Sequence, residues 1–172
     1  MMSDRALSYP VALSLGSNLG DRHKNIALME DMVRGILEPP FRMSSLMETE
    51  PLEVTTWQPA YLNRMVCGSF SGDAKQLLKL CQSIEIDLGR TDKGRKLART
   101  ADIDIILFEN IQIQSEILSI PHPQLFSRRF CIEGLCEIVP EWRVPGTAFT
   151  IMKLYDTIRF AVKDQKIQKV TA

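Results

Sequence analysis

Two aspartates, Asp102 and Asp104, stand one residue apart in the run of residues 101–108. Because side chains alternate along a β-strand, both carboxylates would point to the same side, with their backbones roughly 6.6 Å apart. Like charges this close repel each other, so a metal ion or cationic side chains must offset the cost. Hard carboxylate oxygens favour Mg²⁺, which keeps several waters and shares its ligands with phosphate chains. We therefore predict that Asp102 and Asp104 are metal ligands.

The strand itself is predicted from the apolar residues that fill the alternate positions, Ala101, Ile103, Ile105 and Leu107. An ordinary half-buried strand, apolar inside and polar outside, would show the same alternation without any metal. Ile106 and Phe108, however, continue the aspartate face with apolar residues, so that this face is partly covered. Carboxylates at the edge of a covered face need partners, which favours the metal-site interpretation.

Basic residues crowd the segment just before the aspartates: Arg90, Lys93, Arg95, Lys96 and Arg99 against a single acid, Asp92. A solvated loop is the alternative interpretation of such a charge run. Arginine forks onto phosphate oxygens and lysine supplies a point charge, so a phosphate chain could bridge this segment and a metal on the strand. The segment is not a P-loop, because the Lys-Ser/Thr pair is missing and it follows a helical pattern rather than a strand.

Two further groups could bind a ligand. His122 lies between two prolines and close to Arg128 and Arg129, which indicates either a phosphate contact or a structural histidine. Tyr61 and Asn63 share one face of a predicted strand, where a ring could stack on a flat heterocycle and an amide could read its edge. A cross-strand aromatic and a turn asparagine are the plainer alternative for that pair.

Size and composition favour one cytoplasmic domain. The chain has 172 residues, 45% of them hydrophobic, and a formal net charge of zero, which argues against nucleic-acid or membrane-surface binding. The four cysteines form no CxxC pair and only two histidines are present, so we expect reduced thiols and no zinc site. No signal peptide or membrane-length apolar run is evident. We expect a single domain over residues 1–162, a frayed tail over residues 163–172, and a monomer.

The order of predicted elements is βαββαβ followed by helices. Strands are expected near residues 9–15, 42–48, 61–70 and 101–108, with helices near residues 22–37 and 73–88. Further helices are expected near residues 127–138 and 149–160. This order predicts an α+β, ferredoxin-like fold with a largely antiparallel sheet and additional helices.

From about residue 11 to residue 145, these segments resemble the 6-hydroxymethyl-7,8-dihydropterin pyrophosphokinase family. The Arg-x-x-Asp-hydrophobic-Asp run is that family's signature and is fairly specific. The segments that carry the resemblance are residues 15–21, Thr49-Glu50-Pro51-Leu52, Tyr61-Leu62-Asn63, Leu88-Gly89-Arg90, Arg99 to Asp104, and Pro121-His122-Pro123 with Arg128.

The resemblance implies an enzyme that transfers the β,γ-diphosphate of ATP to the hydroxymethyl group of the pterin in folate biosynthesis, releasing AMP. It implies that Asp102 and Asp104 hold two Mg²⁺ ions and that Arg90 and Arg99 join them in catalysis. The nucleotide-binding residues that it implies are Gln82, Glu85, Arg95, Lys96, Arg99, Ile105, His122 and Arg128. The pterin-binding residues that it implies are Thr49, Leu52, Tyr61, Asn63 and Phe130, although the spacing of Phe130 also fits a core position.

Two other functions use the same features. A non-catalytic ferredoxin-like module that binds nucleotides or RNA would tolerate the loss of Asp102, but it would want a basic sheet face. A two-metal phosphoesterase could use the aspartate pair, but it has no use for a heterocycle pocket at Tyr61 and Asn63.

Overall fold

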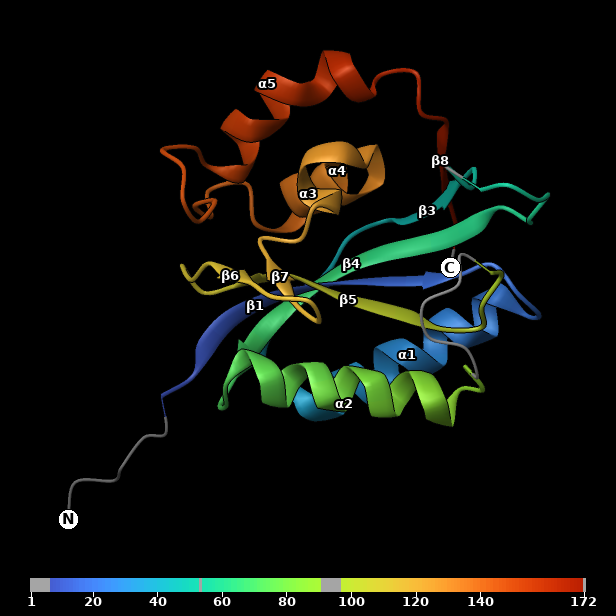
Figure 1. The fold of residues 1–172 in the computed structure, drawn as a ribbon, viewed down its shortest axis with the longest axis horizontal. Coiled ribbons are helices and arrows are strands. Elements are labelled where there is room, and N and C mark those ends of the chain that lie inside the picture. Colours follow the sequence, from blue (N-terminus) through green and yellow to red (C-terminus); the bar gives the residue numbers. More distant parts are fainter. Residues whose placement is uncertain (1–6, 53, 91–96, 172) are drawn as a thin grey trace.

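The computed structural model describes residues 7–52, 54–90 and 97–171. Five helices and eight strands are assigned within these ranges (Figure 1). The strands are β1 (Tyr9–Ser17), β2 (Glu38–Met43), β3 (Leu46–Thr49), β4 (Tyr61–Phe70), β5 (Asp102–Phe108), β6 (Ile113–Gln114), β7 (Ser119–Ile120) and β8 (Ile167–Val170). The helices are α1 (Arg22–Ile36), α2 (Ala74–Asp87), α3 (Gln124–Ser127), α4 (Arg129–Ile138) and α5 (Ile151–Val162).

The main sheet has the strand order β5-β1-β4-β3-β8, and β2 also pairs with β4. Each ladder of this sheet is antiparallel. Helix α1 connects β1 to β2 and helix α2 connects β4 to β5, so each helix joins two strands that have another strand between them. This is the split βαβ arrangement. The predicted α+β fold with a largely antiparallel sheet is confirmed.

Helices cover both faces of the sheet (Figure 1). Helices α1 and α2 lie on one face, where a first core forms around Leu13, Met29, Val66, Leu77 and Ile103. Helices α3, α4 and α5 lie on the other face, over a second core around Met65, Ile106, Leu125, Ile132 and Leu135. No helix among the described residues is long and apolar enough to cross a membrane.

Helix starts follow the capping chemistry of the sequence. Asp21 accepts a hydrogen bond from the Lys24 N–H at the start of α1, and Asp73 and Gln76 form a capping box at the start of α2. Three apolar side chains of α1 recur at helical spacing on its buried face: Ile26, Met29 and Val33. These local signals explain why both helices were predicted close to their observed bounds.

Strand β5 departs from the simple alternation predicted for it. Leu107 packs in the second core, whereas Ala101, Ile103 and Ile105 pack in the first. The register of β1 against β5 shifts between Ala12 and Leu13, which leaves Ile106 as an extra residue on β5. Such a bulge reverses the side-chain alternation beyond it. The change falls after Asp104, so both aspartates keep the shared face that was predicted.

The C-terminal segment is also more ordered than predicted. We expected a frayed tail over residues 163–172, but Ile167–Val170 form β8 and pair with Leu46–Thr49 of β3. The tail has no strong alternation of its own, and its pairing depends on the free edge of β3. The single strand predicted over residues 42–48 is likewise two strands, β2 and β3.

Candidate active site

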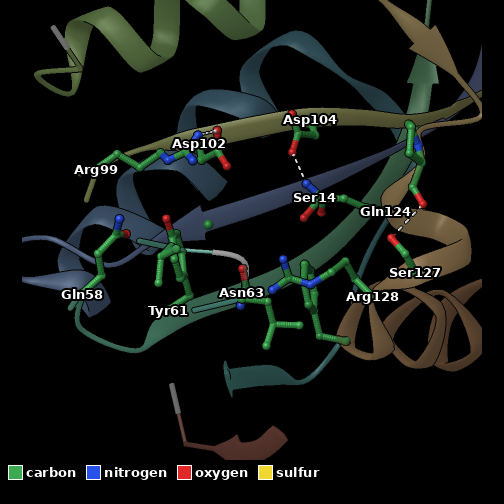
Figure 2. Close-up of a pocket in the computed structure, with 15 residues that line it drawn as sticks. Ser14, Gln58, Tyr61, Asn63, Arg99, Asp102, Asp104, Gln124, Ser127 and Arg128 are labelled. Atoms are coloured by element: carbon green, nitrogen blue, oxygen red, sulfur yellow. Dashed lines mark hydrogen bonds and ion pairs between the residues drawn. The ribbon is translucent and has the colours of Figure 1, made fainter. Parts of the chain in front are cut away.

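A pocket of about 270 Å³ opens on the face of the sheet that carries α3 and α4, beside those helices. Its floor comes from β1, β4 and β5, and its rim from Leu52, Val54 and Gln58 and from residues 123–130. Figure 2 shows Arg99, Asp102 and Asp104 along one side, with Tyr61, Asn63 and Arg128 facing them. The lining residues are Ser14, Gly16, Leu52, Val54, Gln58, Tyr61, Asn63, Arg99, Asp102, Asp104, Pro123, Gln124, Ser127, Arg128 and Phe130.

The aspartates lie opposite two small residues of β1. Asp102 pairs with Gly16 and Asp104 with Ser14 in the β1–β5 ladder. A Cβ atom added at Gly16 would lie 3.1 Å from Asn63 Oδ1 and 3.7 Å from the Asp102 Cβ. The missing side chain of Gly16 therefore keeps the floor open between the acidic strand and Asn63. The sequence analysis did not single out Gly16 or Ser14 as pocket residues.

Asp102 is held by two arginines. Its Oδ1 accepts hydrogen bonds from Arg90 Nη1 at 2.9 Å and from Arg99 Nη1 at 2.8 Å. Arg90 also donates to the carboxylate of Glu85, which in turn accepts from the Ile103 N–H at 2.7 Å. Glu85 is buried, and this burial raises its pKa. The network fixes the N-terminal end of β5 to α2, so Glu85 and Arg90 support Asp102 from behind the pocket.

Asn18 fixes Arg99, although it was not predicted to be a site residue. The Asn18 N–H donates to the Arg99 carbonyl at 3.0 Å, and its Oδ1 accepts from the Arg99 N–H at 2.8 Å. Its amide nitrogen donates to Gln58 Oε1 at 3.2 Å. Asn18 is only 1% exposed. The burial of Asn18 marks it as a structural residue, but burial depends on the tertiary fold and cannot be read from the local sequence.

Asp104 has a different environment from Asp102. Its Oδ2 accepts a hydrogen bond from Gln124 Nε2 at 2.7 Å, and its Oδ1 lies 3.9 Å from His122 Nε2. Burial, together with the negative charges of Asp102 and Glu85, raises the pKa of Asp104 to about 7. Burial lowers the pKa of His122, so this imidazole is neutral at neutral pH. Gln124 was not predicted either, because it lies 20 residues from Asp104 in the sequence and meets it only in the folded chain.

The opposite side of the pocket holds the predicted heterocycle residues. Asn63 donates from its amide to Thr49 Oγ1 at 2.8 Å, and both side chains are buried. Leu52, Tyr61 and Phe130 line the pocket as predicted, whereas Thr49 lies behind Asn63. The guanidinium carbon of Arg128 lies 5.4 Å from the centre of the Phe130 ring.

Some predicted site residues are not brought to the pocket. The side chain of Ile105 packs in the first core, on the face of the sheet away from the aspartates, so it is not placed to contact a ligand there. Gln82 lies on α2 and does not line the pocket. Arg95 and Lys96 lie outside the described residues.

The chemistry of the aspartate pair fits a hard divalent cation. Burial and two neighbouring carboxylates raise the pKa of Asp104, so a bound cation would stabilise its ionised form. Among the described residues there is no cluster of three or more His, Cys, Asp or Glu side chains suited to a metal. The protein would therefore supply two carboxylates and leave other positions to water and phosphate, as Mg²⁺ accepts.

Comparison with known proteins identifies the family. Residues 12–140 match the family described as 7,8-dihydro-6-hydroxymethylpterin-pyrophosphokinase (HPPK). The chain belongs to the HPPK family. The match runs from within β1 to beyond α4 and includes all of the residues that line the pocket. Helix α5 and strand β8 lie beyond it.

Several HPPK relatives are similar over most of this chain. The Bacillus subtilis (strain 168) protein named 2-amino-4-hydroxy-6-hydroxymethyldihydropteridine pyrophosphokinase is 38% identical over 140 residues, which are 79% of this chain and 81% of that protein. A protein of the same name from Porphyromonas gingivalis is 37% identical, over 78% of this chain and 93% of its own. The Pisum sativum protein named folate synthesis bifunctional protein, mitochondrial, is 35% identical, but the match spans only 25% of its length.

Solved structures show the same fold. A triple mutant of Plasmodium falciparum HPPK-DHPS with SDX-DHP aligns with a TM-score of 0.71 at 17% identity. The alignment covers 94% of this chain but 46% of that chain, so this chain spans less than half of the two-part protein.

Proposed function

We propose that this protein transfers the β,γ-diphosphate of ATP to the hydroxymethyl group of 6-hydroxymethyl-7,8-dihydropterin and releases AMP, as a step of folate biosynthesis. One observation carries the proposal: the acidic pair Asp102 and Asp104 faces Tyr61 and Asn63 across a single pocket. A phosphate-handling side and a heterocycle-binding side therefore share one space. Membership of the HPPK family supports the same reaction.

The reaction joins the pterin hydroxymethyl oxygen to the β-phosphorus of ATP. The bond between that phosphorus and the α,β-bridging oxygen breaks, AMP leaves with the bridging oxygen, and the hydroxyl proton is lost to solvent. Such transfers need positioning and charge stabilisation more than covalent help from the protein. The pocket offers both, because its arginines share one space with the aspartates and with the ring and amide opposite them.

The arginines of the pocket stabilise negative charge on the phosphates. Arg99 and Arg128 line the pocket, and Arg90 holds Asp102 from behind. Asp102 and Asp104 would hold two Mg²⁺ ions, which supply neutralisation of the charge that develops on the transferred group. Tyr61 and Phe130 would flank the flat pterin, while Asn63, anchored by Thr49, would read its edge.

The two alternatives fit the pocket less well. A non-catalytic binding module gives no reason for a buried carboxyl group at Asp104 beside two other carboxylates. A phosphoesterase would use the acidic pair but not the ring and amide opposite it. We also propose a cytoplasmic monomer with one catalytic domain, because the composition is that of an ordinary globular protein. The predicted boundary at residue 162 is moved to include β8, which pairs with β3 in the main sheet.

The proposal is tested by incubating the protein with ATP, Mg²⁺ and hydroxymethyldihydropterin and measuring AMP. AMP must form only when the pterin is present. AMP or ADP formation without pterin would support the phosphoesterase instead, and binding without turnover would support the module.

Variants of the aspartates test the metal assignment. We expect Asp102→Ala and Asp104→Ala each to lower turnover by roughly a thousandfold or more, because each removes a charge that positions the phosphates. The exposed Asp31→Asn on α1, on the opposite face of the sheet, is the matched control and should retain full activity. Near-normal turnover in either pocket variant would remove the metal assignment.

A further inference from the structure

The chain beyond α5 folds back against the wall of the pocket. Strand β8 pairs with β3, with Ile167 opposite Thr49, and the Lys166 N–H lies 3.4 Å from Glu50 Oε1. The same segment therefore reaches the strand that anchors Asn63 through Thr49. Residues 163–170 lie outside the segment that defines the family match.

Arg128 occupies a break between two helices. Helix α3 ends at Ser127 and helix α4 begins at Arg129, and Arg128 between them is extended, with φ −116° and ψ 118°. A break of this kind leaves the last carbonyl of one helix and the first N–H of the next without partners from a continuing helix. Those two groups are the Ser127 carbonyl and the Arg129 N–H.

One side chain of the C-terminal segment closes both gaps. Gln165 donates from Nε2 to the Ser127 carbonyl at 2.7 Å, and its Oε1 accepts from the Arg129 N–H at 2.9 Å. Arg129 Nη1 returns a hydrogen bond to the Gln165 carbonyl at 3.1 Å. A carboxamide suits this place because it carries one donor and one acceptor side by side.

We propose that Gln165 is a positioning residue for the reaction and acts through Arg128. By holding the backbone on either side of Arg128, it keeps that residue extended and directs its side chain into the pocket over Phe130. Without Gln165, the two helices can satisfy the same backbone groups by joining, which would turn Arg128 away from the pocket. The inference rests on the proposed function, because it requires Arg128 to act on the phosphates bound in the pocket.

A double-mutant cycle tests the coupling. We expect Gln165→Ala to lower kcat/KM for pterin-dependent AMP formation by about tenfold. In an Arg128→Ala background the same change should lower kcat/KM by less than about twofold, because the group through which Gln165 acts is gone. Gln165→Glu keeps the acceptor but loses the donor to Ser127, so it should behave like Gln165→Ala. An equal loss in both backgrounds, or wild-type kcat/KM in Gln165→Ala, would overturn the proposal.

Two further measurements separate positioning from simple folding. The exposed neighbour Gln168→Ala on β8 is the matched control and should keep wild-type kcat/KM. Hydrogen exchange of the Arg129 amide should be slow in the wild type and fast in Gln165→Ala, while amides of β4 stay protected in both. Equal protection of Arg129 in both proteins would contradict the inference. If the wild type itself made no pterin-dependent AMP, the proposed function would fail instead, which is a distinct result.

Discussion

The two aspartates of β5 differ in how their charge is balanced. Asp102 receives two guanidinium groups, Arg90 and Arg99, whereas the hydrogen bond to Asp104 comes from the neutral amide of Gln124. Negative charge on Asp104 is therefore less well balanced than negative charge on Asp102. Under the proposed function Asp104 would bind a cation, and its ionised form would weaken the folded protein when the cation is absent.

Replacing Asp104 by asparagine should stabilise the metal-free protein at high pH. Folding raises the pKa of Asp104 from 3.8 to about 7, so the ionised form favours the unfolded chain. The penalty is absent below pH 4, grows as the pH rises toward 7, and is complete above that. We expect Asp104→Asn to gain about 1–2 kcal/mol in the free energy of unfolding at pH 8. The Asp104 side chain is 28% exposed, so solvent screens part of the repulsion.

Urea denaturation in the presence of EDTA measures this gain. Asparagine can still accept the hydrogen bond from Gln124, so lost packing should not mask the effect. The gain should vanish at pH 4, and Asp31→Asn should show no comparable pH dependence. A variant less stable than the wild type at pH 8 would show that Asp104 is not under repulsion.

At the scale of elements, α4 approaches β4 closely at Gly134. A Cβ atom added at this glycine would lie 2.5 Å from Met65 Cγ and 3.3 Å from Ser44 Oγ. Gly35 in α1, by contrast, has nothing within 4 Å of the same position. A methyl group would therefore be crowded at Gly134 but would meet no neighbour at Gly35.

Alanine at these two positions should change stability in opposite directions. We expect Gly134→Ala to lower the free energy of unfolding by about 1–3 kcal/mol, because the methyl group forces α4 away from Met65. Gly35→Ala should raise it by about 0.5–1 kcal/mol, because alanine favours the helix and meets no neighbour. Both values come from urea denaturation. If Gly134→Ala were stabilising, α4 could shift away from Met65 without cost. The close contact at Gly134 would then not fix the position of α4 beside the pocket.

At the scale of the whole molecule, the sheet separates two cores, and cysteines are buried in both. Cys81 belongs to the first core, and Cys67 and Cys131 to the second. Burial raises the pKa of all four thiols, that of Cys81 to about 12 and that of Cys136 to about 11. Thiolates, not thiols, react with disulfide reagents.

Thiol reactivity should therefore report on global unfolding. We expect a colorimetric disulfide reagent at pH 8 to label the native protein very slowly, with the half-buried Cys136 reacting first. In concentrated urea all four cysteines should react. Rapid labelling of two or more thiols in the native protein would show that one of the cores opens on its own.

Most of the architecture was predictable from the sequence because its signals are local. Caps at Asp21 and Asp73, helical spacing in α1 and alternation before Asp104 each lie within a few residues. The acidic pair, Arg99, Tyr61 and Asn63 followed from the same local patterns. The structure brings them into one pocket, and their individual roles remain predictions.

The parts that could not be predicted depend on partners far along the chain. Asn18 meets Arg99, Gln124 meets Asp104, and Gln165 meets the backbone beside Arg128. Nothing near these residues in the sequence marks them, because a polar side chain becomes distinctive only once the fold buries it. The tail was expected to fray for the same reason, since β8 needs the edge of β3.

The β1–β5 ladder pairs Asp102 with Gly16 and Asp104 with Ser14. The register of β5 therefore decides which of its side chains face the pocket. A slip of β5 by one residue against β1 would send both carboxylates toward α1 and α2 and bring isoleucines into the pocket. A slip by two residues would return the carboxylates to the pocket face of the sheet. Register shifts of β5 among homologues should therefore come in even steps, whereas the loops on either side are free to vary by any number.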